Sequence, residues 1–117
     1  MTTINIQIAS QIFTAKFIDN ASSQVFVAML PMTIDMIELN DNEKYAHLPS
    51  DLPTNAQQVQ TINTGDLMLY GADILVLFYQ TFSTSYGYTR LGCIEDASGL
   101  ADALGDSGVQ VTFGLAS

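Results

Sequence analysis

The stretch 65–104 contains three short apolar segments separated by turn residues. Residues 67–70 and 74–79 flank a Gly-Ala-Asp turn, and residues 88–94 follow a loop rich in Ser, Thr and aromatic residues. Apolar segments this short, bounded by turns, predict strands rather than helices. Because the segment 74–79 has no charged or small polar residue, its strand is expected to be buried on both faces.

Alternation of apolar and polar residues predicts four more strands, because successive side chains of a strand face opposite ways. These strands cover residues 4–8, 13–17, 32–36 and 109–115. A helix is expected between Asn20, which can cap its first turn, and Pro31, which ends it. A second, short helix is expected over 98–104, with Asp96 as its cap and Gly105 after its last turn.

The long polar stretch 40–64 contains two prolines and shows little periodicity. We expect a loop there, with a short edge strand at 59–62. Loops longer than about 12–15 residues in a small domain generally bind something or hold short elements of their own. The stretch is therefore a source of candidate site residues.

The pattern as a whole contains about seven or eight short strands and two helices. Short, evenly spaced strands predict a mainly β fold, in which mostly antiparallel strands form a small closed barrel and the helices cover its ends. The length suits a single domain spanning residues 1–117. With 48% apolar and 13% charged residues, the composition excludes a disordered chain.

The charge of the chain is strongly acidic. Twelve acidic residues face three basic ones, Lys16, Lys44 and Arg90, for a net charge of −9. Such a surface repels phosphate groups, so neither nucleic acid nor an anionic membrane is expected as a partner. The sequence also lacks an apolar run of the roughly 18 residues that a membrane span needs.

Two further features predict a cytoplasmic protein. The N-terminus lacks the basic and apolar regions of a signal peptide. Cys93, the single cysteine, cannot form an internal disulfide and is expected to be buried as a small apolar residue. Both features fit a reducing compartment.

Three of the predicted strands resemble the cyclophilin fold, and more closely the small bacterial cyclophilin-like domain proteins. The similar segments read Gly-Asp-Leu-Met-Leu-Tyr from Gly65, Ile-Leu-Val-Leu-Phe-Tyr from Ile74, and Thr-Arg-Leu-Gly-Cys-Ile from Thr89. The order of strands and helices agrees over nearly the whole chain. The resemblance implies a cyclophilin-like barrel, and it raises peptidyl-prolyl isomerase activity as an alternative function.

The residues that cyclophilins use for isomerisation differ here. Their pocket takes an arginine from a Phe-His-Arg strand, a glutamine and phenylalanines from the core strand, a tryptophan and a histidine. This sequence has no tryptophan and no Phe-His-Arg triplet, and Tyr88 falls near the position of the family's histidine. An isomerase of this kind would have to use Arg90, so whether the chain is an enzyme stays open.

Arg90 and the aromatic loop before it form the first candidate ligand site. Tyr88 shares a strand face with Arg90, whose guanidinium can clamp a carboxylate or a carbonyl; the alternative is a surface ion pair with one of the acids. Phe82 and Tyr86, with neighbouring hydroxyls, resemble the wall of a small-ligand site, because rings supply area and hydroxyls supply direction. Alternatively, these rings simply cover the barrel end.

Lys44, Tyr45 and His47 add candidates from the long polar stretch. His47 is either a general base near neutral pH or a solvated loop residue. No metal is expected, because one His and one Cys far apart do not make a zinc site. No cofactor is expected either, since Gly-rich phosphate-binding motifs are absent.

Three functions are consistent with these observations. The first is a non-catalytic binding domain whose cleft takes a small anion or a peptide carbonyl, from a small molecule or a peptide. Its lining residues would be Phe82, Tyr86, Tyr88, Arg90, Lys44, Tyr45 and His47. The second is a prolyl isomerase that uses Arg90. The third is a homodimer that meets through an apolar face bearing Tyr70 and Tyr79.

Overall fold

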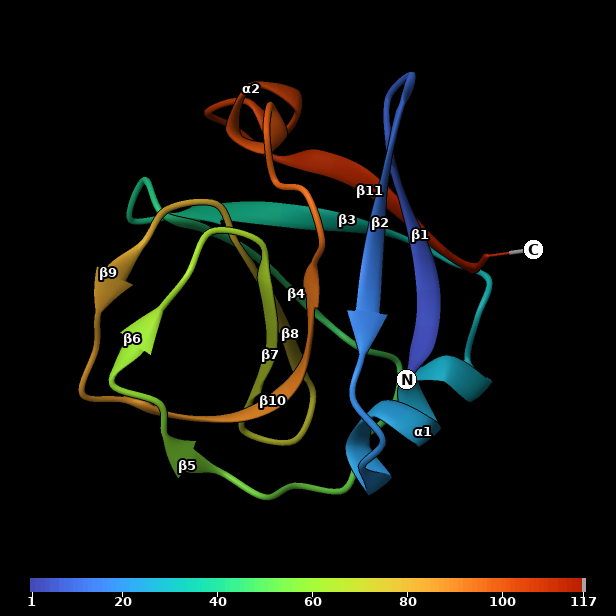
Figure 1. The fold of residues 1–117 in the computed structure, drawn as a ribbon, viewed down its shortest axis with the longest axis vertical. Helices are drawn as coiled ribbons and strands as arrows, with labels where there is room; N and C mark the ends of the chain where they lie inside the picture. Colours follow the sequence, from blue (N-terminus) through green and yellow to red (C-terminus); the bar gives the residue numbers. More distant parts are fainter. Residues whose placement is uncertain (117) are drawn as a thin grey trace.

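Eight antiparallel strands close into a barrel in the computed structural model, which describes residues 1–116 (Figure 1). The barrel strands are β1 (Thr2–Ile8), β2 (Gln11–Phe17), β3 (Met32–Leu39), β4 (Glu43–His47), β7 (Asp66–Tyr70), β8 (Ile74–Phe78), β10 (Gly87–Ile94) and β11 (Val109–Leu115). Their order is β2-β1-β11-β3-β4-β8-β7-β10, and β10 pairs back with β2 to close the barrel. The mainly β, closed-barrel fold expected from the sequence is therefore confirmed.

Three short strands lie outside the barrel. The strand β5 (Gln57–Gln58) pairs with the start of β10, while β6 (Thr61–Ile62) and β9 (Phe82–Ser83) pair with each other. They come from the two longest loops, and Figure 1 shows them together on one side of the barrel. These three short strands stand beside the outer face of β7, β8 and β10.

Helix α1 (Ala21–Ala28) covers one end of the barrel (Figure 1). The Asn20 side chain accepts a hydrogen bond from the Ser23 backbone N–H at 2.8 Å, which confirms Asn20 as the cap. Phe26 is buried, and its ring centroid lies 5.3 Å from that of Phe17 and 5.6 Å from that of Phe113. These rings fill this end of the barrel.

Helix α2 (Leu100–Leu104) covers the opposite end, with Leu100 and Leu104 buried in the core. It begins two residues later than predicted, and Asp96 as its cap is wrong: the N-cap is Gly99, while Asp96 accepts a hydrogen bond from the Ser98 N–H at 3.0 Å in a preceding turn. Gly105 follows the helix with a φ of 73°, as expected of a terminating glycine. Neither helix within residues 1–116 has the length and apolarity to cross a membrane.

A buried lysine joins α2 to the barrel wall. The Lys44 side chain is 0% exposed, and its Nζ lies 2.9 Å from Glu38 Oε1, 2.8 Å from the Gly105 carbonyl and 2.7 Å from the Ser107 carbonyl. The Tyr79 hydroxyl donates a further hydrogen bond to Glu38. Burial acts against ionisation of Glu38, but the bonds from Tyr79 and Lys44 still hold its pKa below the usual value. All three ammonium hydrogens have acceptors, which is what makes a buried lysine tolerable.

The expected loop over 40–64 is wrong for residues 43–47, which form β4 between β3 and β8. The inward positions of this strand are Lys44 and Ala46, and only the second is apolar. The charge of Lys44 is balanced by Glu38 inside the barrel and not by water. Residues 43–47 are therefore as polar as a loop, although they are buried like a strand. The usual alternation signal is therefore missing.

The barrel closes at Gly92, where β10 pairs with β7 on one side and begins to pair with β2 on the other. A bulge between Arg90 and Gly92 shifts the register with β7, and Gly92 then pairs with Phe17. A Cβ on Gly92 would lie 2.3 Å from the Lys16 carbonyl oxygen and 2.9 Å from Phe17 Cα, so only glycine permits this approach. The bulge also leaves Cys93 exposed, so its expected burial is wrong.

Replacing Gly92 by alanine should destabilise the barrel, because the backbone of β2 would have to move away. We expect Gly92→Ala to lower the free energy of unfolding by about 2–4 kcal/mol, measured by urea denaturation. Gly114→Ala on β11 is the matched control, since a Cβ there meets nothing within 4 Å. Equal stability of the two variants would contradict this account of closure.

Replacing Lys44 by methionine should also destabilise the fold, because two carbonyl groups and Glu38 lose their buried donor. We expect Lys44→Met to cost about 3 kcal/mol or more in the same measurement. Lys16→Met is the control, since Lys16 Nζ makes one hydrogen bond, 2.6 Å from Thr3 Oγ1, and should cost less than about 1 kcal/mol. A Lys44→Met protein as stable as the parent would show that the network is dispensable.

Candidate functional site

The outer face of β7, β8 and β10 carries a second apolar cluster, separate from the barrel core. Its buried members are Ile62, Met68, Val76, Phe78 and Tyr88. Along β8, Leu75 and Leu77 face the core while Val76 and Phe78 face this cluster, which confirms the strand predicted to be buried on both faces. Part of the cluster is covered by the β6–β9 pair, where the Phe82 ring centroid lies 5.7 Å from that of Phe78.

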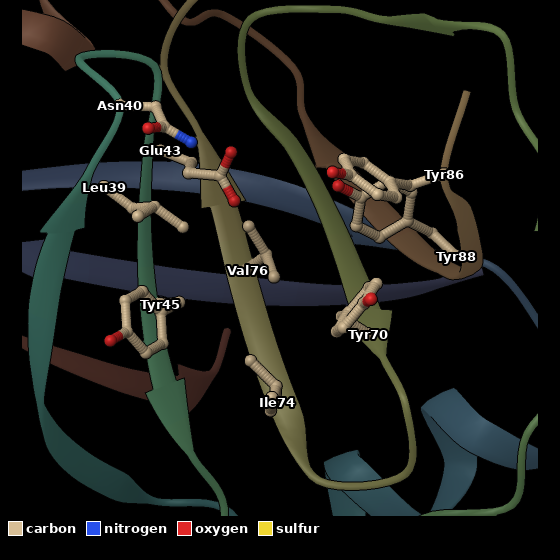
Figure 2. Close-up of a pocket in the computed structure, with 9 residues that line it drawn as sticks. All are labelled: Leu39, Asn40, Glu43, Tyr45, Tyr70, Ile74, Val76, Tyr86 and Tyr88. Atoms are coloured by element: carbon tan, nitrogen blue, oxygen red, sulfur yellow. The ribbon is translucent and has the colours of Figure 1, made fainter. Parts of the chain in front are cut away.

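An open pocket of about 300 Å³ lies beside this cluster, across β4, β8 and β7 (Figure 2). Four of the five tyrosines line it, namely Tyr45, Tyr70, Tyr86 and Tyr88, together with Glu43. Leu39, Asn40, Ile74 and Val76 complete the lining. Hydrophobic and aromatic walls with a few polar groups are typical of small-ligand sites.

The tyrosine rings stand at angles to one another instead of stacking. The Tyr70 ring centroid lies 5.7 Å from that of Tyr88, at 57°, and 6.3 Å from that of Tyr86, at 86°. Tyr88 is buried at the base, while Tyr70 and Tyr86 are exposed at the rim. Tyr45 lies across the pocket on β4, with Ile74 and Val76 between it and the other rings (Figure 2). The rings thus form two walls around an aliphatic floor.

Glu43 contributes the charged group of the pocket. Its position on the outer side of β4 is 8% exposed, and Figure 2 shows its carboxylate extending over β8 into the pocket. Burial first, and then the negative charge of Glu38, raise the pKa of Glu43 to about 7. No hydrogen bond from residues 1–116 opposes this rise. The fold therefore holds a carboxyl group that is half ionised near neutral pH and has no stabilising partner.

The charge of Glu43 acts on Tyr88 across the pocket. Burial first, and then the charge of Glu43, raise the pKa of Tyr88 to about 12. The Tyr88 hydroxyl consequently stays protonated at neutral pH, as a hydrogen-bond donor or acceptor for a ligand. The pocket thus offers one titrating carboxyl group and neutral hydroxyls.

The structure brings three of the seven sequence-predicted site residues into this pocket: Tyr45, Tyr86 and Tyr88. Phe82 lies behind it, packed on Phe78. Lys44 does not reach it, because neighbouring residues of a strand face opposite sides and its ammonium group is inside the barrel.

Arg90 and His47 lie outside the lining of the pocket. Arg90 shares the outer face of β10 with Tyr88, but it is exposed farther along the strand, where its charge acts on Asp66. His47 is exposed with its Nδ1 3.1 Å from Asp73 Oδ2, and its ring centroid lies 6.5 Å from that of Tyr45. His47 is therefore a neighbour of one tyrosine wall.

Six of the nine lining residues were missed as candidates for a ligand site, among them Glu43 and Tyr70. Glu43 alternates with Tyr45 and His47, a period of two that becomes informative only when residues 43–47 are known to form a strand. Tyr70 was expected on one face with Tyr79, but Tyr79 is buried with its hydroxyl on Glu38, whereas Tyr70 faces the pocket. These two tyrosines therefore do not form a shared surface.

Comparisons with known proteins agree with this architecture. The sequence model of the Cyclophilin-like family matches residues 6–114. The fold is similar to that of the hypothetical protein AF2241 from Archaeoglobus fulgidus, whose solution structure aligns with a TM-score of 0.60 at 16% identity. That alignment covers 98% of this chain and 95% of the archaeal chain, and at this identity the likeness concerns the fold alone. No protein with a curated description matches the chain.

The family match begins within β1 and ends within β11, so it reaches every strand of the barrel. The resemblance expected from three strand segments is confirmed by this match. With 109 of its 117 residues matched, counted from 6 to 114, the chain belongs to the Cyclophilin-like family.

Proposed function

We propose that this chain is a non-catalytic binding module whose ligand occupies the tyrosine pocket. The observation that carries the proposal is the carboxyl group of Glu43, which the fold holds largely out of water without a partner among residues 1–116. The ligand is a small molecule, or one side chain of a peptide, with an apolar body and a polar group directed to Glu43.

The dimensions and the lining support a ligand of this kind. A volume of about 300 Å³ lies at the lower end of the range for ligand pockets. Tyrosine side chains supply large contact areas and lose little conformational entropy on binding, since each has only two side-chain torsions. Their hydroxyl groups and Glu43 supply the directional contacts.

The free energy that the fold loses by burying the Glu43 carboxylate also supports a binding role. Taking a carboxylate out of water is unfavourable unless it is paired or hydrogen-bonded. Lys44, the next residue, shows how this chain satisfies a buried charge when the purpose is structural. An unpaired group beside a fully satisfied one is typical of a site where stability is traded for function.

The small anion expected from the sequence depended on Arg90 and Lys44, neither of which lines the pocket. A peptide carbonyl has hydroxyl donors available there, but above neutral pH it would meet the negative charge of Glu43. The isomerase alternative likewise needs Arg90 in the cleft. Binding without turnover, to a ligand that donates hydrogen bonds or carries positive charge, is the proposal that the lining supports best.

Ligand mapping tests the location of the site. We expect a mixed-charge library of small fragments to shift the backbone NMR signals of pocket residues, and Tyr86→Ala to weaken the best fragments by about 5–30-fold through lost ring contact. Leu115→Ala is the control, because Leu115 is 58% exposed and Tyr86 62%, but Leu115 lies on β11, outside the pocket. Shifts centred instead on the polar hollow lined by Gln11, Thr14 and Glu95 would contradict the proposal.

The stability cost of Glu43 is separately testable. Because the folded-state pKa of about 7 lies above the ordinary glutamate value of 4.5, the folded state holds a proton that the unfolded state has released between these two values. Stability is then lost as the pH rises through this window. We expect Glu43→Gln to be more stable than the parent by about 1–3 kcal/mol at pH 8, with the difference vanishing below about pH 4.5.

Glu95→Gln serves as the control for this measurement, since Glu95 is exposed. Urea denaturation at several pH values gives the comparison directly. A Glu43→Gln protein less stable than the parent at pH 8 would mean that the carboxylate supports the fold, and the argument from its cost would fail.

A further inference from the structure

We infer that the polar group of the ligand is an organic cation of the alkylammonium type, held between the tyrosine rings and the Glu43 carboxylate. This inference rests on the proposed function, since it names the chemical class of the ligand for the same pocket. It follows from what the pocket contains and from where the basic residues of the chain lie.

No basic side chain among residues 1–116 lines the pocket. Lys44 is engaged on the inner side of β4 by Glu38 and two carbonyl groups. Lys16 is bonded to Thr3 on β1, and Arg90 is exposed farther along β10. The negative charge of Glu43 is therefore not met by the fold itself, and a ligand cation would supply what is missing.

Aromatic rings around a carboxylate favour an ammonium group. The faces of Tyr rings carry partial negative charge and attract cations within about 6 Å of the centroid. Tyr70 and Tyr86 stand at 86° to each other, so one compact group can touch both rings. Cages of this kind, closed by an acidic group, are well suited to alkylated ammonium ions, whose charge is spread over methyl or methylene groups.

The aliphatic residues of the lining favour an organic cation over a metal ion. Leu39, Ile74 and Val76 offer contact area to methyl or methylene groups but no metal ligand. Calcium takes six to eight oxygen ligands, and magnesium needs near-octahedral oxygen coordination. A single carboxylate among rings and aliphatic side chains does not provide this, whereas an alkylammonium ion is matched on both its charged and its apolar parts.

The net charge of the whole molecule also favours a cationic ligand. A net charge of −9 attracts cations and repels anions, most strongly at low ionic strength. The same ammonium chemistry is available from a free amine or from the lysine side chain of a peptide. Probes of both kinds therefore belong in the test.

Ionisation of Glu43 should govern the affinity. The titratable groups that surround it are Glu38 on β3, Tyr45 on β4, Tyr70 on β7, and Tyr86 and Tyr88 at β10. Glu38 ionises below its usual pKa and Tyr88 at about 12, so neither changes charge near neutrality. Cation affinity is expected to rise with pH as Glu43 loses its proton near pH 7.

The decisive comparison uses choline and 3,3-dimethylbutan-1-ol, which have the same shape but differ in charge. Both are titrated at pH 8 and constant ionic strength into the parent and into Glu43→Gln, with NMR shifts of the tyrosine rings as the readout. We expect choline to bind the parent at least tenfold more tightly than the alcohol, and this preference to be lost in Glu43→Gln. At pH 5.5, choline affinity for the parent should fall by tenfold or more.

Equal binding of choline and the alcohol, unchanged in Glu43→Gln, would overturn the cation inference and leave the binding proposal standing. If neither choline nor the alcohol binds, but neutral or anionic fragments bind the pocket, the cation inference is likewise overturned and the binding proposal stands. Failure of every probe and fragment would overturn both. A peptide containing trimethyllysine that binds at least tenfold more tightly than choline would support the inference and identify a peptide side chain as the source; the reverse order would support it with a free amine as the source.

Discussion

The close approach of β10 to β2 at Gly92 is the constraint on which the rest of the structure depends. With a Cβ only 2.3 Å from the Lys16 carbonyl, no other residue fits without displacing β2. From Gly92 onward β10 lies between two neighbours, because Gly92 and Cys93 pair with β7 on one side and with β2 on the other. Closure of the barrel thereby sets the face on which Tyr88 meets β7 and β8, and so positions one wall of the pocket.

Strand β4 places two adjacent charged residues, Glu43 and Lys44, on opposite sides of the barrel wall. Lys44 points inward, where its ammonium group donates hydrogen bonds to Glu38 and to two carbonyl groups. Because those carbonyl groups follow α2, the bonds join this helix to the barrel wall. Glu43, one residue earlier, points outward into the tyrosine pocket, where no residue of 1–116 offsets its burial. Because successive residues of a strand face opposite ways, one pair of adjacent charged residues serves stability on one side and, as we propose, ligand binding on the other.

Much of the fold could be predicted from local patterns, but the site could not. Alternation located four of the eight barrel strands and short apolar segments between turns located three more, while Asn20 and Gly105 marked helix ends, because these signals depend on near neighbours in sequence. The strand that begins at Glu43 was missed, since one of its inward positions is a lysine. A charged residue indicates a loop unless the groups that bind it inside the fold are known. The pocket unites β4 with β7 and β10 through non-local pairing, which the spacing of residues in sequence does not reveal.

The central claim is that Glu43 is a ligand-binding group without a partner in the fold, and its own titration tests this most directly. Carboxyl ¹³C signals of the parent, assigned with Glu43→Gln, would be followed against pH with and without saturating choline. The account predicts a midpoint of about 7 for Glu43 alone and a lower midpoint when choline is bound, because a nearby cation favours the carboxylate. A midpoint near the ordinary glutamate value of 4.5 that choline leaves unchanged would contradict it.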